Sequence, residues 1–162
     1  MRLEDRPIVE LQHAVEALQS SYVECIDDDR LEEWPQHFTA DCIYKVLPRE
    51  NADRGLPLAT IFCDSRGMLA DRIISLRNAN IYALHYYRHI LSNVRIKQVE
   101  NGVITAQSNY VVLQTKQDGA THIFNAGKYL DKIVEVDGAL KFKEKIAVTD
   151  TYRVDTLIVR PI

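Results

Sequence analysis

The second half of the chain carries three turn signals that restrict its fold more than any other feature of the sequence. The pairs Asn101-Gly102, Asp118-Gly119 and Asp137-Gly138 each separate two runs of strand-like composition. Such pairs favour the positive φ angles that tight hairpin turns require. From His89 onward, apolar and polar residues also alternate, as in residues 94–97, which is the period of a strand with one buried face. The sequence therefore predicts an antiparallel meander.

The strands of this meander are long, and long strands curve. The turn signals are 17 and then 19 residues apart, whereas a typical strand has about five or six residues. Strands of that length coil strongly, and Gly127 is the expected place of a bulge or bend. In the last strand, apolar even-numbered residues alternate with lysines: Leu140, Phe142, Ile146 and Val148, with Lys141, Lys143 and Lys145 between them. The even-numbered residues should face the core, and Glu144 on that side should be paired or line a polar part of the interior.

The first half of the chain has the period of helices. In its first stretch, apolar residues recur at spacings of three and four: Ile8, Leu11, Val15, Leu18, Tyr22 and Ile26. This spacing predicts a helix from Pro7 to Asp27, with the proline in the first turn, where it is tolerated. A second, shorter helix should follow, capped by Asp29 and kinked or restarted at Pro35. Its inward-facing residues are expected to be Leu31, Trp34 and Phe38.

A strand, a loop and a third helix should connect these helices to the meander. Residues 42–47 have the composition of a strand, and the loop after them contains Pro48, Gly55 and Pro57. Asp64 or Ser65 can cap the third helix. Its apolar stripe consists of Met68, Leu69, Ile73 and Leu76. Helices first and strands afterwards favour an α+β fold, so we expect one domain, residues 1–162, in which a curved antiparallel sheet wraps around the N-terminal helices as a cone.

Composition and charge exclude several classes of protein. The chain is 46% hydrophobic and 27% charged, and it has no apolar run of about 18 residues, so no membrane segment is expected. The net charge of −3, without a basic stripe, argues against nucleic acid as a partner. The start of the chain has no secretory signal, and Cys25, Cys42 and Cys63 are spaced as free thiols would be. We therefore expect a cytoplasmic protein.

The sequence contains no motif that would hold a cofactor. A Rieske cluster needs two Cys and two His ligands, and their pattern is missing, as are the common nucleotide, hydrolase and zinc motifs. His85 and His89 have a spacing that suits metal ligands on a helix, but their segment precedes the first meander strand, which favours structural hydrogen bonds. Residues 27–33 are rich in acids and could attract a hard cation, although helix capping explains them without an ion. We expect no catalytic, cofactor-binding or metal-binding residue in this chain.

Two further groups of residues can be interpreted either as structural or as functional. Side chains able to act as acid or base inside a cone are His37, Tyr44, His122 and Asp131. Nothing in the sequence shows that they converge, and buried polar residues with satisfied partners are the usual outcome. Aromatic residues that could form either a core or an interface are Tyr82, Tyr86, Tyr87 and Trp34.

Several segments resemble the small β subunits of bacterial ring-hydroxylating dioxygenases. The most specific is the Arg-His pair that leads into Ser-Asn-Val in residues 88–95. Ser108-Asn109-Tyr110 resembles the next strand of the family, and Tyr44-Lys45-Val46 with Arg49-Glu50-Asn51 resembles its early region. Residues 31–34, followed by Phe38, Asp41 and Tyr44, match the same region, so the resemblance covers nearly the whole chain.

This resemblance implies a cystatin-like cone of the scytalone dehydratase and nuclear transport factor type. It also implies a structural subunit without its own cofactor, bound to a large catalytic α subunit, commonly as α3β3. The large subunit would carry the Rieske [2Fe-2S] cluster and the mononuclear Fe(II), and a ferredoxin and an NAD(P)H-dependent reductase would supply electrons. Within the family, the chain looks most like the benzoate, anthranilate, terephthalate and salicylate hydroxylases, with salicylate as the first expected substrate. The alternatives are a self-contained dehydratase or isomerase of the same fold and a small-molecule binding module.

Overall fold

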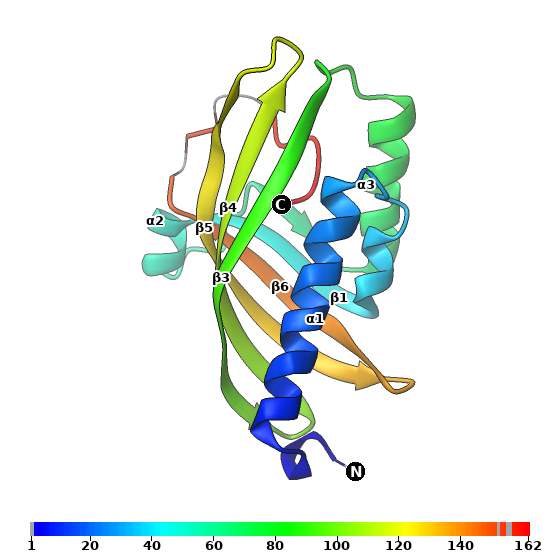
Figure 1. Ribbon diagram of the computed structural model, residues 1–162, viewed down its shortest axis with the longest axis vertical. Helices are drawn as coiled ribbons and strands as arrows, with labels where there is room; N and C mark the ends of the chain where they lie inside the picture. The colour runs from blue at the N-terminus through cyan, green and yellow to red at the C-terminus, as the bar shows by residue number, and fades with distance from the viewer. Residues whose placement is uncertain (1, 152, 155–156) are drawn as a thin grey trace.

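The computed structural model describes residues 2–151, 153–154 and 157–162, which form helices and one curved sheet (Figure 1). The helices are α1 (Ile8–Asp27), α2 (Arg49–Asp53) and α3 (Arg66–Asn78), with 3-10 turns at Leu3–Asp5 and Trp34–His37. The strands are β1 (Phe38–Pro48), β2 (Ile61–Cys63), β3 (His85–Glu100), β4 (Val103–Lys116), β5 (Thr121–Val136) and β6 (Ala139–Thr149). Helices dominate the first half and long strands the second, which confirms the predicted α+β fold.

The strands form one sheet in the order β2-β1-β6-β5-β4-β3. Strands β3 to β6 pair with their sequence neighbours in antiparallel fashion, which confirms the predicted meander. At the other side of the sheet the prediction was incomplete, because β1 lies parallel to β6 and the short strand β2 pairs with β1. Helix α1 runs across the front of the sheet, and α3 stands beside it (Figure 1). The buried core lies between these helices and the inner face of the sheet.

The three turn signals are real hairpin turns of two kinds. In Asn101-Gly102 the φ angles are 53° and 75°, and in Asp137-Gly138 they are 51° and 78°. Two positive φ angles in succession define the tightest hairpin turns. At the remaining signal only Gly119, with φ of 84°, is left-handed, and the loop is closed by a hydrogen bond from the N–H of Lys116 to the carbonyl of Ala120.

The alternation predicted for β6 breaks at a β-bulge. Opposite Lys132 the strand contains one extra residue, Lys143, so that the later residues change faces. Lys145, which we expected to face water, is therefore fully buried. Glu144 turns to the other side, where its carboxylate lies 3.3 Å from the ammonium of Lys132. Ile146, expected in the core, is only partly buried.

Gly127 has a different role from the bulge that we expected there. The register shifts of β5 fall elsewhere, and Gly127 pairs regularly with Thr149 of β6 and Tyr110 of β4. A Cβ atom at this position would lie 2.0 Å from the carbonyl oxygen of Val148. The residue is a glycine because two backbones approach each other too closely for a side chain.

Helix α1 agrees closely with its prediction. Its buried face includes Leu11, Val15, Tyr22 and Ile26. Leu18 of the predicted stripe is only half-buried, and Ile8 is 58% exposed. Ile8 is the first residue of the helix, and Cα–Cβ bonds tilt towards the N-terminus, so its side chain points past the helix end.

The second predicted helix is replaced by turns. Asp29 has a φ of 58°, a left-handed conformation that cannot cap a following helix, and its carboxylate instead binds Arg77 at 2.9 Å and Arg160 at 3.0 Å. The chain turns helical again only in the short 3-10 segment, with Pro35 in its first turn. The expected inward-facing residues are nonetheless buried: Leu31, Trp34 and Phe38.

The third helix begins as predicted. The hydroxyl oxygen of Ser65 accepts a hydrogen bond from the N–H of Met68 at 3.3 Å and caps α3. The side chain of Met68 is 39% exposed, contrary to our expectation. Its neighbour Leu69 points into the core, and successive residues of a helix are rotated by about 100°, so Met68 points away from the core. The other predicted core residues of this helix are buried: Leu69, Ile73 and Leu76. The loop before it also contains α2 and β2, which were not predicted.

Candidate functional site

Residues 160–162 are buried in the interior of the cone, and residues 157–159 lead into it from the surface. Ile162 is fully buried, and the hydroxyls of Tyr22 on α1 and Tyr44 on β1 donate hydrogen bonds to its carbonyl oxygen at 2.9 and 3.0 Å. The N–H of Ile162 donates in turn to the hydroxyl of Tyr44 at 3.2 Å. The segment therefore closes the cone from within.

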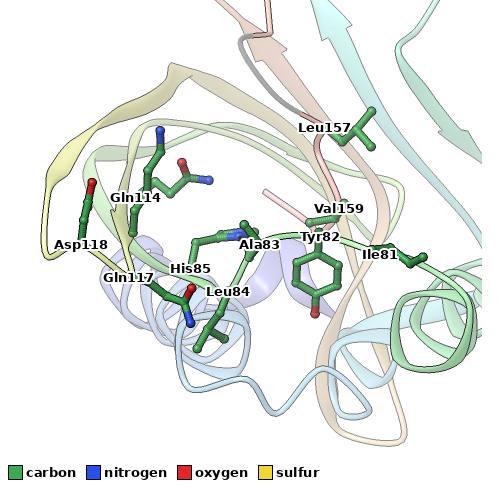
Figure 2. Close-up of a pocket in the computed structure, with 11 residues that line it drawn as sticks. Ile81, Tyr82, Ala83, Leu84, His85, Gln114, Gln117, Asp118, Leu157 and Val159 are labelled. Carbon is green, nitrogen blue, oxygen red and sulfur yellow. Dashed lines mark hydrogen bonds between the residues drawn. The ribbon is translucent and has the colours of Figure 1, made fainter.

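A pocket of about 580 Å³ lies at the mouth of the cone (Figure 2). Three parts of the chain line it, namely residues 81–85, which lead into β3 and include its first residue, the β4–β5 hairpin and the segment 157–159. The aliphatic side chains of its wall are Ile81, Ala83, Leu84, Leu157 and Val159. This size and lining fall within the range of small-molecule sites, about 300–1,000 Å³ and mostly apolar.

Polar groups enter the pocket from the inner faces of β3 and β4. His85 pairs in register with Lys116, and Tyr87 pairs with Gln114. Gln114 and Lys116 are two residues apart on one strand and so point to the same face. The side chain of Gln114, although 3% exposed, directs its amide towards the space between the two walls (Figure 2).

A hydrogen bond to the segment just before β3 holds the imidazole of His85 beside the pocket. Its Nδ1 lies 2.8 Å from the carbonyl oxygen of Ala83, and we assign the proton to this nitrogen because a carbonyl can only accept. Burial lowers the pKa of His85, opposed by this hydrogen bond and reinforced by the positive charge of Arg160. The ring is therefore neutral at neutral pH.

Below the pocket, three side chains follow one another on the inner face of β3. His85, Tyr87 and His89 alternate with exposed residues along the strand, and Arg160 lies near them. The atoms Nε2 of both histidines, the hydroxyl of Tyr87 and Nε of Arg160 are enclosed and have no hydrogen-bond partner within the described part of the chain. This row gives the interior a hydrogen-bonding capacity that the apolar core lacks.

His89 is bound to the end of helix α1. Its Nδ1 lies 2.6 Å from Oδ1 of Asp27, and its main-chain N–H donates to Oδ2 of the same carboxylate at 2.8 Å. A histidine paired with a carboxylate is the arrangement that an acid–base enzyme uses. Here, however, the outward nitrogen Nε2 is enclosed, so the pair holds two elements together and presents no group to a substrate in this conformation.

A buried ion pair lies between α1, β5 and β6. The ammonium of Lys145 is 3.2 Å from Oδ1 of Asp131, and Gln19 bridges them by donating to Asp131 and accepting from Lys145 at 2.9 Å. Lys145 also lies 3.7 Å from the ring centre of Tyr129 and 4.3 Å from that of Phe142. Burial lowers the pKa of Lys145 to about 8, while Asp131 opposes that shift. Burial likewise raises the pKa of Asp131, opposed by Lys145.

The four acid–base candidates from the sequence have separate partners. His37 lies between the hydroxyl of Ser21, at 3.0 Å, and the carbonyl of Trp34, and burial lowers its pKa. Tyr44 binds Ile162 and Asp131 binds Lys145. The fourth candidate, His122, is exposed on β5. The structure thus gives them no common site.

The acidic segment 27–33 is neutralised by protein cations. Asp29 and Glu32 both bind the guanidinium of Arg77, and Glu33 pairs with Arg30. Within the described residues, no three side chains of His, Cys, Asp or Glu gather as a metal site would require. Among all the residues that the structure describes, no helix is long and apolar enough to cross a membrane.

The aromatic candidates divide between core and surface. Trp34 and Tyr87 are buried, whereas Tyr86 is 57% exposed and Tyr82 lines the pocket. Sequence reasoning missed Gln114 and Lys116 as pocket residues. The alternation of side chains along a strand was enough to place them on the inner face of β4. The segment 157–159 opposite them has no sequence pattern that indicates its position.

Comparisons with known proteins agree with the fold and with the resemblance. The family model described as "Ring hydroxylating beta subunit" matches residues 22–156. The small subunit of anthranilate 1,2-dioxygenase from Burkholderia cepacia is 47% identical over 145 residues, 90% of each chain. The β subunit 2 of the terminal oxygenase component of terephthalate 1,2-dioxygenase from a Comamonas species is 41% identical over 91% of this chain and 96% of that protein.

Solved structures give the same result. A crystal structure assigned to the β subunit of an aromatic-ring-hydroxylating dioxygenase from Novosphingobium aromaticivorans has a TM-score of 0.88 at 44% identity, over 96% of this chain and all of that one. A protein assigned as a scytalone dehydratase from the same organism shares the fold, with a TM-score of 0.69 at 22% identity over 96% of this chain and 97% of that one. The protein is thus a cone-fold subunit of an oxidoreductase complex. It belongs to the family of ring-hydroxylating β subunits.

Proposed function

We propose that this chain is the structural small subunit of a Rieske non-haem iron oxygenase that hydroxylates a carboxylated aromatic ring. The observation that carries the proposal is family membership over most of the chain, together with relatives that are small subunits of anthranilate and terephthalate dioxygenases. The chain works in the cytoplasm as part of an oxidoreductase in aromatic catabolism.

The substrate that we propose is an ortho-substituted benzoate. Salicylate is our first candidate from the sequence, and the anthranilate-dioxygenase relative supports the same class, because the two acids differ only in the ortho hydroxyl or amino group. Product analysis with this pair of substrates distinguishes monohydroxylation of the ring from dihydroxylation.

The division of labour that we propose places the redox chemistry in the large subunit. That subunit carries the Rieske [2Fe-2S] cluster and the mononuclear Fe(II), and it assembles with this chain as an α3β3 hexamer. A ferredoxin and a reductase deliver electrons from NAD(P)H. The small subunit provides a stable scaffold, to which the packed cone, the hydrogen bonds between Asp27 and His89 and the buried ion pair of Asp131 and Lys145 contribute.

A self-contained dehydratase or isomerase is the second candidate function. One observation favours it, namely the carboxylate–imidazole pair of Asp27 and His89 inside a cone. The enclosed Nε2 of His89 counts against it, since a general base must reach the proton that it removes.

Co-expression with a gene for a large subunit of the same family tests the proposal. The two chains should co-purify in equal amounts as a brown complex that hydroxylates salicylate or anthranilate when ferredoxin, reductase and NADH are added. A complex with His85→Ala should contain as much iron as the wild type. Conversion of an aromatic acid by the small chain alone, or full activity of a large subunit that never associates with it, would overturn the proposal.

A further inference from the structure

We propose that the pocket at the mouth of the cone binds a monocyclic aromatic carboxylate, so that the small subunit has a ligand site of its own. The identity of the ligand rests on the proposed function, which supplies the class of small molecule that this protein meets. The existence of the site rests on the pocket itself.

The walls of the pocket suit a flat apolar ring. Ala83 and Leu84 lie on one side and Leu157 and Val159 on the other, so the space between them is bordered by aliphatic groups (Figure 2). The ring of Tyr82 lines the same space and can pack against an aromatic ligand. A volume of about 580 Å³ accommodates a single substituted ring with room for water.

One side of the pocket has the groups that a carboxylate needs. The amide of Gln114 makes no side-chain hydrogen bond within the described protein, and the ammonium of Lys116 has no ion pair there. Because the two residues share one face of β4, an amide N–H and an ammonium can approach the same anionic group. Hydrogen bonds to a charged group are about twice as strong as those between neutral groups.

Two other titratable groups, His85 and Asp118, line the pocket. His85 is neutral because burial lowers its pKa. Asp118 lies at the hairpin turn, where its carboxylate accepts the N–H of Ala120 at 2.9 Å. The position of this carboxylate is set by the turn, while Lys116 is free to reach the ligand.

Methyl NMR on the small subunit tests the site both in the free chain and within the complex. The methyl group of Ile81, which lines the pocket, should shift in a saturable way when anthranilate is added, while that of Ile74 on α3, exposed but outside the pocket, should not. The neutral analogue 2-aminobenzamide, which keeps the ring and loses the charge, should bind at least about tenfold more weakly.

Two variants and one matched control locate the interaction. Lys116→Met and Gln114→Leu should each weaken anthranilate binding about tenfold or more, with unchanged melting temperatures. Lys97→Met removes an exposed lysine on the far part of β3 and should leave binding unchanged. No saturable shift of Ile81, equal binding of the amide, or an equal loss in Lys97→Met would overturn the proposal. If anthranilate binds but no large subunit associates, the site stands and the proposed function falls.

Discussion

The carboxylate of Asp27, the last residue of α1, accepts two hydrogen bonds from His89 of β3, one from the main-chain N–H and one from the ring. The contact joins the end of a helix to an edge strand whose N–H and C=O groups would otherwise lack partners. Nearer the start of the helix, Gln12 also provides hydrogen-bond partners for this edge strand. Its side-chain amide donates to the carbonyl of Val94 at 2.7 Å and accepts from the N–H of Ile96 at 3.4 Å. Helix α1 therefore covers the open edge of β3 through its side chains.

Removal of the Asp27 carboxylate should be costly. Asp27→Ala leaves two buried N–H groups of His89 without acceptors, so we expect the free energy of unfolding to fall by about 2–3 kcal/mol. Asp27→Asn keeps an acceptor oxygen and should lose less. Urea unfolding measures both. Asp28→Ala, at an exposed neighbour, should change stability by no more than about 0.5 kcal/mol, and a loss in Asp27→Ala no greater than this would contradict the role of the contact.

Local periodicity predicted most of the fold, because its signals lie within one element. The hairpin turns and the stripe of α1 could be read directly. The contact between Asp27 and His89 could not, although the sequence drew attention to both residues, because they are far apart in the chain and only the folded sheet brings them together. The prediction of which β6 residues face the core was wrong after Lys143 for a related reason. One extra residue at this position turns the side chains that follow it to the opposite faces of the sheet.

The candidate site was harder to predict than the fold. Strand parity places Gln114 on an inner face, but nothing local shows that a pocket opens there. Its opposite wall, residues 157–159, has no regular secondary structure, and its position depends on Tyr22 and Tyr44, which anchor Ile162. Long-range tertiary contacts determine this arrangement, so the local periodicity of the sequence cannot predict it.

The buried pair of Asp131 and Lys145 should be strongly coupled. Lys145→Met leaves a carboxylate buried without its partner, and we expect a loss of about 3–5 kcal/mol. A triple variant, Gln19→Leu, Asp131→Leu and Lys145→Met, removes all three polar groups and should recover most of that loss. Chemical denaturation provides the values. Lys132→Met, which breaks the exposed pair with Glu144, should cost no more than about 1 kcal/mol, and a triple variant less stable than Lys145→Met would rule out the coupling.

Gly127 should tolerate no side chain. Gly127→Ala would bring a methyl group to within 2.0 Å of a main-chain oxygen, and because neither backbone can move freely within the sheet, we expect a loss of about 3 kcal/mol or more. The matched substitution is Gly67→Ala in α3, where the nearest atom would be 3.8 Å away and alanine favours the helix, so that stability should rise by up to about 1 kcal/mol. Thermal unfolding followed by circular dichroism distinguishes the two outcomes, and equal melting temperatures for both variants would refute the close-approach explanation.

The thiol of Cys25 should make the protein less stable in alkali. Burial raises its pKa from 9.0 to about 12, opposed by the nearby charge of Arg30. Because the folded state keeps this proton while the unfolded state releases it, the stabilising contribution is complete below pH 9 and is lost as the pH rises towards 12. In Cys25→Ala, the decline of the unfolding free energy between pH 9 and pH 11 should be shallower than in the wild type by up to about 1.4 kcal/mol per pH unit.

The slope of this decline, and not its absolute level, carries the test, because the alanine also removes packing. Val23→Ala, on the same helix and without a titratable group, should give a curve parallel to that of the wild type. The measurements require a reducing agent, since thiolates oxidise in alkali. The buried tyrosines also hold their protons, with the pKa of Tyr44 raised to about 12 by burial, so part of the alkaline decline persists in every variant. Parallel curves for Cys25→Ala and the wild type would mean that the thiol titrates normally and that the core around it is open to water.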